Sequence, residues 1–338
     1  MSTERAAGAP RTASVTGTSA APRIVLVTGG TGTLGRHVVA VLAEQPGVAA
    51  RVLSRRGRAA DTPPDLEWVT ADLASDPLEA ALEGIDAVIH LASEKGAGEA
   101  DVVGTRRLLE AAGLAAVRHV VVISIIGCDR VPLPFYASKM RIEALTRASR
   151  APWSIVRVAQ FHSFVERLVA MPASLPVPAP IITDLRFQPV DEREVAERLV
   201  DIALGPPLGD APEIAGPEVL TLGEIAAAWL ADSDRPATLI PVPLDVLLQG
   251  PAGPGAGPRA GPRAGLGSGP GTGPGARGTP ETRDAPAAPA DAAWAPDGWV
   301  PAVLEGYRSG DTTARGAVTP GRVRFVDWLR QRRGSPPD

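Results

Sequence analysis

A glycine-rich run near the start of the chain has the residue types and spacing that bind phosphate groups. Residues Gly29-Gly30-Thr31-Gly32-Thr33-Leu34-Gly35 contain the pattern Gly-x-Gly-x-x-Gly between an apolar run, 23–28, and a predicted helix, 34–44. The apolar run is typical of a buried parallel strand. Gly32 would let the backbone approach a pyrophosphate, and Gly35 would let the helix pack closely on the strand. Because the N–H groups at the helix start would face the anion, we expect this loop to contact a dinucleotide through Gly29 and residues 31–35.

The residues that follow the second predicted strand, 50–54, bear on which dinucleotide is bound. An Asp or Glu at this place would bind the ribose 2′-hydroxyl of NAD. The chain has Ser54-Arg55-Arg56 instead, and guanidinium groups bind a 2′-phosphate well. Solvated arginines of a surface loop are the alternative. We therefore expect NADP(H) to be preferred, with NAD(H) as the second candidate.

The elements that must position these residues alternate between strands and helices. Apolar runs that predict further buried strands lie at 66–70, 85–91, 119–124 and 153–158, with helical patterns such as 101–112 between them. This alternation predicts an α/β fold, a Rossmann-type doubly wound parallel sheet with the dinucleotide at its carboxyl edge. Asp76, Asp191 and Thr221 each precede a Glu by three positions, which predicts helix starts. A small C-terminal part, from about Ile181, would cover the substrate cleft.

Changes in composition suggest the domain boundaries. Residues 1–22 lack the apolar stretch of a secretory signal and are expected to be a disordered leader. Residues 23–249 would form the NAD(P)-binding Rossmann domain. Gly and Pro supply about half of residues 250–292, which predicts a disordered insertion. Residues 293–338 would form a C-terminal segment that ends in a helix near 322–331, where apolar residues have helical spacing.

The overall composition excludes several classes of protein. The 338 residues carry a formal net charge of -4, which gives no electrostatic reason to expect a nucleic acid or an anionic membrane as partner. The single cysteine, Cys128, allows no intrachain disulfide, and the four histidines lack metal-ligand spacing, so no metal is expected. The sequence has no apolar run of transmembrane length. These features indicate a cytoplasmic protein that acts on a small molecule.

Several short motifs together resemble the short-chain dehydrogenase/reductase superfamily, and within it the atypical, NmrA-like NAD(P)H-binding proteins. The resemblance covers about residues 23–231 and resumes near residue 306. The motifs that carry it are Thr28-Gly29-x-x-Gly32-x-x-Gly35, Asp72-Leu73, His90-Leu91-Ala92-Ser93, Val103-Gly104-Thr105-Arg106-Arg107-Leu108-Leu109, Ser124-Ile125-Ile126-Gly127 and Arg157-Val158-Ala159-Gln160-Phe161-His162. It implies that Asp72 and Leu73 flank the adenine and that Leu91, Ala92 and Ser93 line the cofactor cleft.

The catalytic motif of that superfamily is altered in this chain. In the superfamily, a Tyr four positions before a Lys supplies a proton, while the Lys binds the nicotinamide ribose. Here the position four before Lys139 is Phe135, and Tyr136 lies about 100° further round the helix. Ser124, at the end of the fifth predicted strand, matches a residue that binds the substrate oxygen. Ser124, Tyr136 and Lys139 are therefore the candidate catalytic residues, a packed or exposed Tyr136 being the alternative.

Three residues follow the sixth predicted strand on the ligand side of the sheet. Gln160, Phe161 and His162 are candidate substrate contacts, and a loop histidine without a chemical role is the alternative for His162. The first functional hypothesis is an NADPH-dependent reductase of a small carbonyl or quinone substrate. The second is a non-catalytic NADP(H) redox sensor that acts through a protein partner. A nucleotide-sugar epimerase or dehydratase is disfavoured, because that chemistry relies on the complete Tyr-x-x-x-Lys motif.

Overall fold

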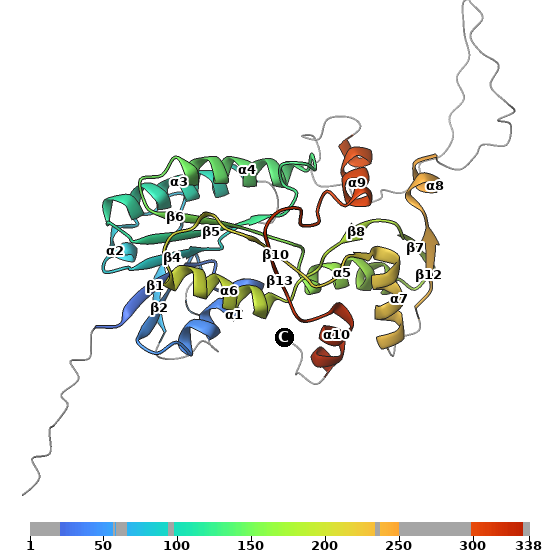
Figure 1. The fold of residues 1–338 in the computed structure, drawn as a ribbon, viewed down its shortest axis with the longest axis horizontal. Helices are drawn as coiled ribbons and strands as arrows, with labels where there is room; N and C mark the ends of the chain where they lie inside the picture. The colour runs from blue at the N-terminus through green and yellow to red at the C-terminus, as the bar shows by residue number, and fades with distance from the viewer. Residues whose placement is uncertain are drawn as a thin grey trace, which may run out of the picture.

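The computed structural model describes residues 21–56, 58, 66–93, 98–233, 237–249 and 299–333 (Figure 1). The predicted leader, 1–22, lies outside the described residues except for its last two positions. The predicted insertion, 250–292, lies wholly outside them. Among the described residues, no helix has the length and apolar character needed to cross a membrane.

A parallel sheet forms the centre of the larger lobe. Its strands run in the order β13-β10-β6-β5-β4-β1-β2-β3, and β9 pairs with β6. Every pairing in this sheet is parallel, so the predicted doubly wound parallel sheet is confirmed. The strands are β1 (Arg23–Thr28), β2 (Val48–Ser54), β3 (Glu67–Thr70), β4 (Ala87–His90), β5 (His119–Ile125), β6 (Trp153–Val158), β9 (Gly209–Asp210), β10 (Glu213–Ala215) and β13 (Val318–Pro320).

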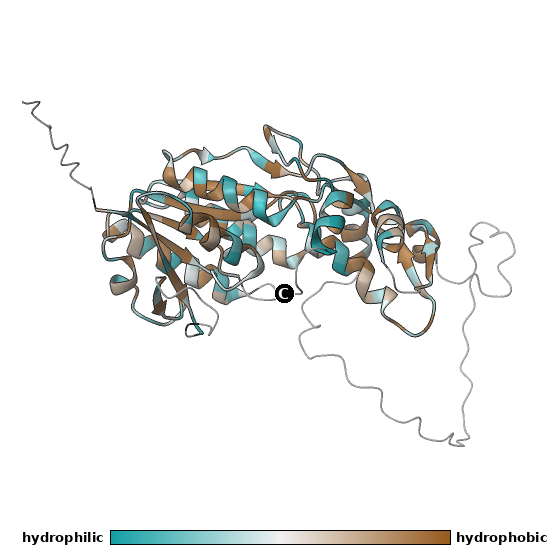
Figure 2. Ribbon diagram, turned by 90° about the horizontal axis from the view of Figure 1, so that it is seen from below, coloured by the Kyte–Doolittle hydropathy of each residue, from teal (hydrophilic) through white to brown (hydrophobic). Residues whose placement is uncertain are grey.

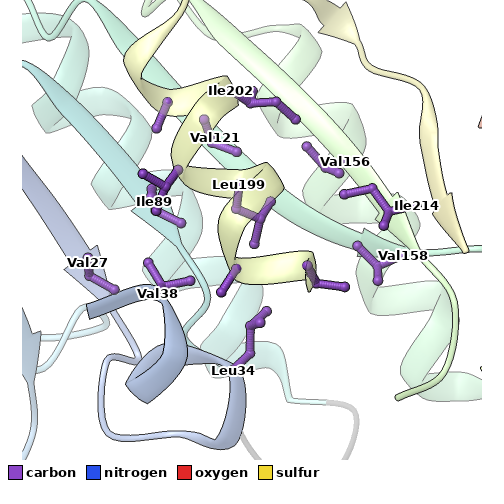
Figure 3. Packing of buried hydrophobic residues seen from close by; sticks show 14 of the residues in the cluster. Val27, Leu34, Val38, Ile89, Val121, Val156, Val158, Leu199, Ile202 and Ile214 are labelled. Carbon is purple, nitrogen blue, oxygen red and sulfur yellow. The ribbon is translucent and has the colours of Figure 1, made fainter. Parts of the chain in front are cut away.

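Helices cover both faces of the sheet because alternate strand residues point to opposite sides. Val25 and Val27 pack with α1 (Thr33–Ala43) and α6 (Glu192–Leu204), and Figure 3 shows Leu34, Val38 and Leu199 of these helices against the strands. Leu26 faces the other side. That side is covered by α2 (Glu79–Leu82), α3 (Glu99–Leu114) and α4 (Pro134–Arg147). Figure 2 shows the strands between these layers as mainly hydrophobic.

A smaller lobe lies beyond the carboxyl edge of the sheet, to the right in Figure 1. Its apolar core is centred on the buried Phe187, Ile225 and Phe325. Two small sheets pair β8 with β11 and β7 with β12. The elements of this lobe are α5 (His162–Ala173), β7 (Ala179–Ile182), β8 (Arg186–Phe187), β11 (Leu220–Thr221), α7 (Leu222–Asp232), β12 (Leu239–Val242), α8 (Leu244–Gln249), α9 (Trp299–Ser309) and α10 (Phe325–Arg333).

Two of the three predicted helix starts are confirmed. The Asp191 side chain accepts hydrogen bonds from two backbone N–H groups of α6, and Thr221 forms a capping box with Glu224 at α7. The predicted start at Asp76 is wrong, since α2 begins at Glu79 without a side-chain cap. The Asp76 carboxylate instead accepts a hydrogen bond from the backbone N–H of Asp72. A nearer backbone donor thus competes with the helix end for this side chain.

Candidate functional site

The glycine-rich loop connects β1 to α1 at the carboxyl edge of the sheet. Gly29 has φ of +72°, and a Cβ atom there would lie 2.8 Å from the backbone nitrogen of Ala92. A Cβ atom at Gly35 would lie 2.1 Å from the carbonyl oxygen of Gly29. Gly32 directly precedes α1, no side chain caps this end of the helix, and its first turn contains no acidic residue. The N–H groups of α1 are therefore available to an anion, which is the arrangement that binds a pyrophosphate.

A cavity of about 250 Å³ lies beside this loop. The ends of β2, β3 and β4 form its walls, together with the first turn of α3. It is lined by Gly29, Thr31, Gly32, Ser54, Arg55, Arg56, Asp72, Leu73, Leu91, Ala92 and Ser93 among the predicted cofactor residues. Four predicted cofactor residues do not line it. Thr33, Leu34 and Gly35 form the start of α1 next to the loop, and Lys139 lies in α4. The structure thus brings the predicted cofactor residues of distant sequence segments to one edge.

The rim of this cavity carries the features expected for an adenosine phosphate. Arg55 and Arg56 are exposed at the end of β2, and the backbone N–H of Arg56 donates to the Ser54 hydroxyl (3.2 Å). The Arg107 guanidinium donates to the carbonyl oxygens of Leu73 (3.2 Å) and Asp76 (2.8 Å). Arg107 therefore fixes the loop that follows β3, of which Asp72 and Leu73 line the cavity.

His90 ties the cavity floor to α3 through a buried hydrogen-bond network. Its Nε2 lies 2.9 Å from the Thr105 hydroxyl, which itself donates to the carbonyl oxygen of Asp101 (2.7 Å). Its Nδ1 lies 2.7 Å from the Thr28 hydroxyl. Since the Thr105 proton is used on Asp101, Nε2 donates. The Thr28 oxygen accepts from the backbone N–H groups of Leu91 (3.2 Å) and Ala92 (3.3 Å), so its own proton is donated to Nδ1 and the ring is neutral. Burial, together with the charge of Lys139, lowers the pKa of His90 to about 3.

Lys139 lies near the cofactor cavity, where its charge acts on His90 of the cavity wall. Its side chain is buried, with 6% exposed, and burial lowers its pKa against the favourable charge of Asp101, which lines the cavity. The Phe135 ring occupies the place of the motif tyrosine, with its centroid 5.2 Å from Lys139 Nζ. A phenyl ring cannot transfer a proton, so the lysine is kept while its usual acid partner is absent.

The Tyr136 side chain is buried, and its hydroxyl is engaged at the lobe junction. Its hydroxyl lies 2.8 Å from the hydroxyl of Tyr307 in α9 and 3.5 Å from Nε2 of Gln160. Burial raises the pKa of Tyr136, although both hydrogen bonds act to lower it. Sequence reasoning missed Tyr307, because it lies beyond the Gly/Pro-rich segment and belongs to no recognisable motif.

Ser124 stands at the end of β5, as predicted, but its proton is directed into the protein. The hydroxyl donates to Oε1 of Glu143 (2.6 Å). Glu143 is completely buried and is held by two hydrogen bonds from Arg157, each 2.8 Å long. Burial would raise the pKa of Glu143, but Arg157 and Ser124 hold it below its ordinary value. Contact of Ser124 with a substrate oxygen stays a prediction.

Cys128 adjoins this ionic cluster, with its sulfur 3.5 Å from Oε1 of Glu143. Burial and the Glu143 charge raise the pKa of Cys128 to about 11. The thiol therefore stays protonated, and this environment gives it no nucleophilic character. Among the described residues, no cluster of side chains suited to a metal ion was found.

His162 begins α5, and its ring is buried under the C-terminal helix. The ring packs on Phe325 and Trp328, each with centroids 5.6 Å away, and Nε2 lies 3.1 Å from the carbonyl oxygen of Val323. Its neighbour Phe161 packs on the core of the larger lobe. The structure thus gives both residues packing contacts, and a role in substrate binding stays a prediction for them.

Comparisons with known proteins find an NAD(P)H-binding domain in the part of the chain that contains the glycine-rich loop. Residues 29–169 match a family model described as NAD(P)H-binding. Those residues form an NAD(P)H-binding domain that is like the domains of atypical short-chain dehydrogenases/reductases. A (4-alkanoyl-5-oxo-2,5-dihydrofuran-3-yl)methyl phosphate reductase of Streptomyces griseus is 29% identical over 223 residues, covering 63% of this chain and 75% of that protein.

Two other relatives match shorter parts of this chain. A ceramide reductase of Caulobacter vibrioides is 31% identical over 199 residues, covering 55% of this chain and 62% of that protein. Photosystem II assembly factor Ycf39 of Trieres chinensis is 31% identical over 164 residues, covering 45% of this chain and 51% of that protein. For both, the matched part is less than two thirds of the relative's length.

Solved structures share the fold of this domain. The NAD-dependent NDP-hexosamine 5,6-dehydratase TunA superposes with a TM-score of 0.54 at 21% identity, covering 65% of this chain and 84% of that protein. A UDP-glucose 4-epimerase of Thermus thermophilus in complex with NAD gives a TM-score of 0.55 at 21% identity, covering 65% and 86%. At this identity the likeness concerns the fold alone.

Proposed function

We propose that the chain is an NADPH-dependent reductase of small quinones and conjugated carbonyl compounds. The observation that carries this proposal is the pair of Lys139 and Phe135 at the site. Lys139 is buried near His90 of the cofactor cavity, while Phe135 removes the acid that usually accompanies it. The residues therefore retain the means to orient a nicotinamide ribose without a means to protonate an alkoxide.

The missing acid restricts which acceptors can be reduced. When bound, NADPH supplies a hydride. A simple ketone would become an alkoxide, which must be protonated as it forms. A quinone would become a hydroquinone anion and a conjugated carbonyl compound an enolate, and both anions are stable enough to take a proton from water. The compound named for the Streptomyces griseus relative is a conjugated carbonyl compound, which supports this class of acceptor.

NADPH is the proposed cofactor because of the residues that follow β2. Arg55 and Arg56 are exposed at the rim of the cavity, where the ribose of the adenosine half would lie. Their guanidinium groups match the geometry of a 2′-phosphate. The two loop arginines would thus add affinity for NADPH that NADH cannot gain.

A panel assay tests this proposal. Consumption of NADPH and of NADH is followed by absorbance with naphthoquinone, cyclohexenone and acetophenone as acceptors. We expect turnover of the first two acceptors with NADPH, slower turnover with NADH, and little reduction of acetophenone. Turnover of acetophenone at a rate similar to that of naphthoquinone would overturn the proposal.

The second candidate function is an NADP(H) sensor that acts through a protein partner. Two observations favour it. The Ser124 proton is directed to Glu143, and the Tyr136 hydroxyl contacts that of Tyr307, so both candidate proton donors are engaged inside the protein. Tight NADPH binding without turnover of any acceptor in the panel would favour the sensor over the reductase.

A further inference from the structure

The last described segment of the chain crosses from the larger lobe to the smaller one. In the larger lobe, β13 pairs with β10 of the sheet, and in the smaller lobe α10 enters the core through Phe325 and Leu329. Residues 321–324 connect these two elements and are called the strap below. The strap begins with the Gly321 backbone N–H, which donates to the carbonyl oxygen of Ala215 (2.7 Å). The strap thus starts on the large sheet and ends on the smaller lobe.

Hydrogen bonds to its backbone hold the strap in place. The Glu194 carboxylate of α6 accepts from the backbone N–H groups of Arg322 (2.9 and 3.0 Å) and Val323 (3.2 Å). It also accepts from Nε of Arg322 (3.1 Å). From the smaller lobe, Nε2 of His162 donates to the carbonyl oxygen of Val323 (3.1 Å). One carboxylate of the larger lobe and one imidazole of the smaller lobe therefore bind the same two residues.

The side chains of the strap contribute little burial to this attachment. The Arg322 side chain is 82% exposed, and Arg324 is exposed as well. Two cavities of about 280 and 400 Å³ lie beside the strap, and Glu194, Glu197 and Arg322 line both of them. The first also contacts β13, and the second reaches α10. Because the strap is not packed closely on α6, the charge-assisted hydrogen bonds to Glu194 are its main attachment there.

The position of the strap and α10 decides whether His162 is accessible. His162 begins α5, four positions after the end of β6, on the ligand side of the sheet. Its side chain is nevertheless completely buried, under the rings of Phe325 and Trp328 of α10. Its Nδ1 is buried without a hydrogen-bond partner among the described residues. His162 can therefore meet a small molecule only if α10 moves away from it.

We propose that the strap is a movable device with Glu194 as its latch, and that its release lifts α10 from His162. Release would also expose Phe325 and Leu329, so the closed arrangement prevails and the open one is a minor state. The hydrogen bonds to Glu194 exist only in the closed arrangement, and the population of the open state therefore depends on this carboxylate. The proposal goes beyond the reductase function and does not rest on turnover of any acceptor.

Chemical modification of histidines in the full chain tests the latch. Diethyl pyrocarbonate reacts with accessible imidazole nitrogens, and mass spectrometry of the digested protein gives the rate at each histidine. His90 and His119 are only 4% and 2% exposed in the larger lobe, so they report on opening of the whole fold. Glu194→Gln replaces a carboxylate oxygen by an NH₂ group, which cannot accept from the strap N–H groups. We expect modification of His162 to be about tenfold faster or more in this variant, with His90 and His119 unchanged.

Two further variants separate the latch from a change in charge. Glu197→Gln is the matched control, because Glu197 lies one turn along α6 and pairs with the exposed Arg322 guanidinium (3.5 Å). It should behave like the original chain. Gly321→Ala keeps the Glu194 carboxylate but would place a Cβ atom 2.8 Å from its Oε2, so it should also accelerate modification of His162. NADPH affinity should be unchanged in all three variants, since none of these residues lines the cofactor cavity.

Three results would overturn the proposal. Equal rates at His162 in the original chain, Glu194→Gln and Gly321→Ala would show that the carboxylate is not a latch. Parallel acceleration at His162, His90 and His119 would show that His162 becomes accessible only when the whole protein unfolds. An acceleration in Glu197→Gln as large as in Glu194→Gln would assign the effect to charge alone. The expected pattern in a protein that turns over no acceptor would support the latch and overturn only the reductase function.

Discussion

Replacement of His90 by Gln should remove a large part of the acid sensitivity of the folded protein. The His90 ring is buried between the hydroxyls of Thr28 and Thr105, which fix it in its neutral form. A proton added at Nδ1 would place a charge beside the buried Thr28, where it is also repelled by Lys139. Burial and this repulsion lower the pKa of His90 from 6.5 to about 3.

The size of the effect follows from this pKa. A histidine whose pKa is lower in the folded state stabilises the protein fully above its unfolded pKa of 6.5, and the stabilisation is lost as the pH falls toward about 3. Each pH unit in this window corresponds to about 1.4 kcal/mol. Between neutral pH and about pH 5, His90 should therefore account for about 2 kcal/mol of lost stability.

Urea unfolding at about pH 7.5 and about pH 5 measures this directly. The difference in unfolding free energy between the two pH values should be about 2 kcal/mol smaller in His90→Gln than in the original chain. His162→Gln is the matched comparison, because burial also lowers the pKa of His162. His162→Gln should reduce the acid sensitivity of the fold and leave NADPH binding unchanged. His90→Gln should reduce the acid sensitivity and also weaken NADPH binding. Parallel pH dependence of the original chain and His90→Gln would refute the assignment of a buried neutral His90.

Three further predictions follow from the cofactor loop and the ionic cluster. Joint replacement of Arg55 and Arg56 by Ala should weaken NADPH binding about tenfold or more while sparing NADH; fluorescence titration of both cofactors checks this, and an equal loss for both would contradict it. Gly35→Ala should abolish cofactor binding, since its Cβ would lie 2.1 Å from a backbone oxygen of the same loop, and normal NADPH affinity in this variant would be a contrary result. Glu143→Gln should destabilise the fold by about 3 kcal/mol, because it leaves Arg157 without its main buried partner; an unchanged melting temperature would show that the ion pair contributes little.

The cofactor half of the site could be predicted from the sequence because its determinants are local. The conformation of the Gly29 to Gly35 loop follows from glycines that have no room for a Cβ atom. A parallel sheet then gathers the ends of its strands at one edge. Ser54, Asp72 and Leu91 therefore meet around one cavity although they belong to different strand ends.

The substrate half could not be predicted in the same way, because its contacts join distant segments. The partner of Ser124 is Glu143, 19 positions away, and that of His162 is Val323, 161 positions away. Nothing in the sequence around Ser124 indicates that its proton is directed to a buried carboxylate. Tyr307 carries no motif and becomes a candidate only through its contact with Tyr136.

The central claim is that Phe135 has removed the acid of the site while Lys139 retains the cofactor function. Turnover of naphthoquinone and acetophenone with NADPH, compared between the original chain and Phe135→Tyr, tests it most directly. We predict that Phe135→Tyr raises acetophenone reduction by about 100-fold or more, as a positioned general acid does, and leaves naphthoquinone reduction nearly unchanged. Robust acetophenone reduction by the original chain, with no gain in Phe135→Tyr, would contradict the account.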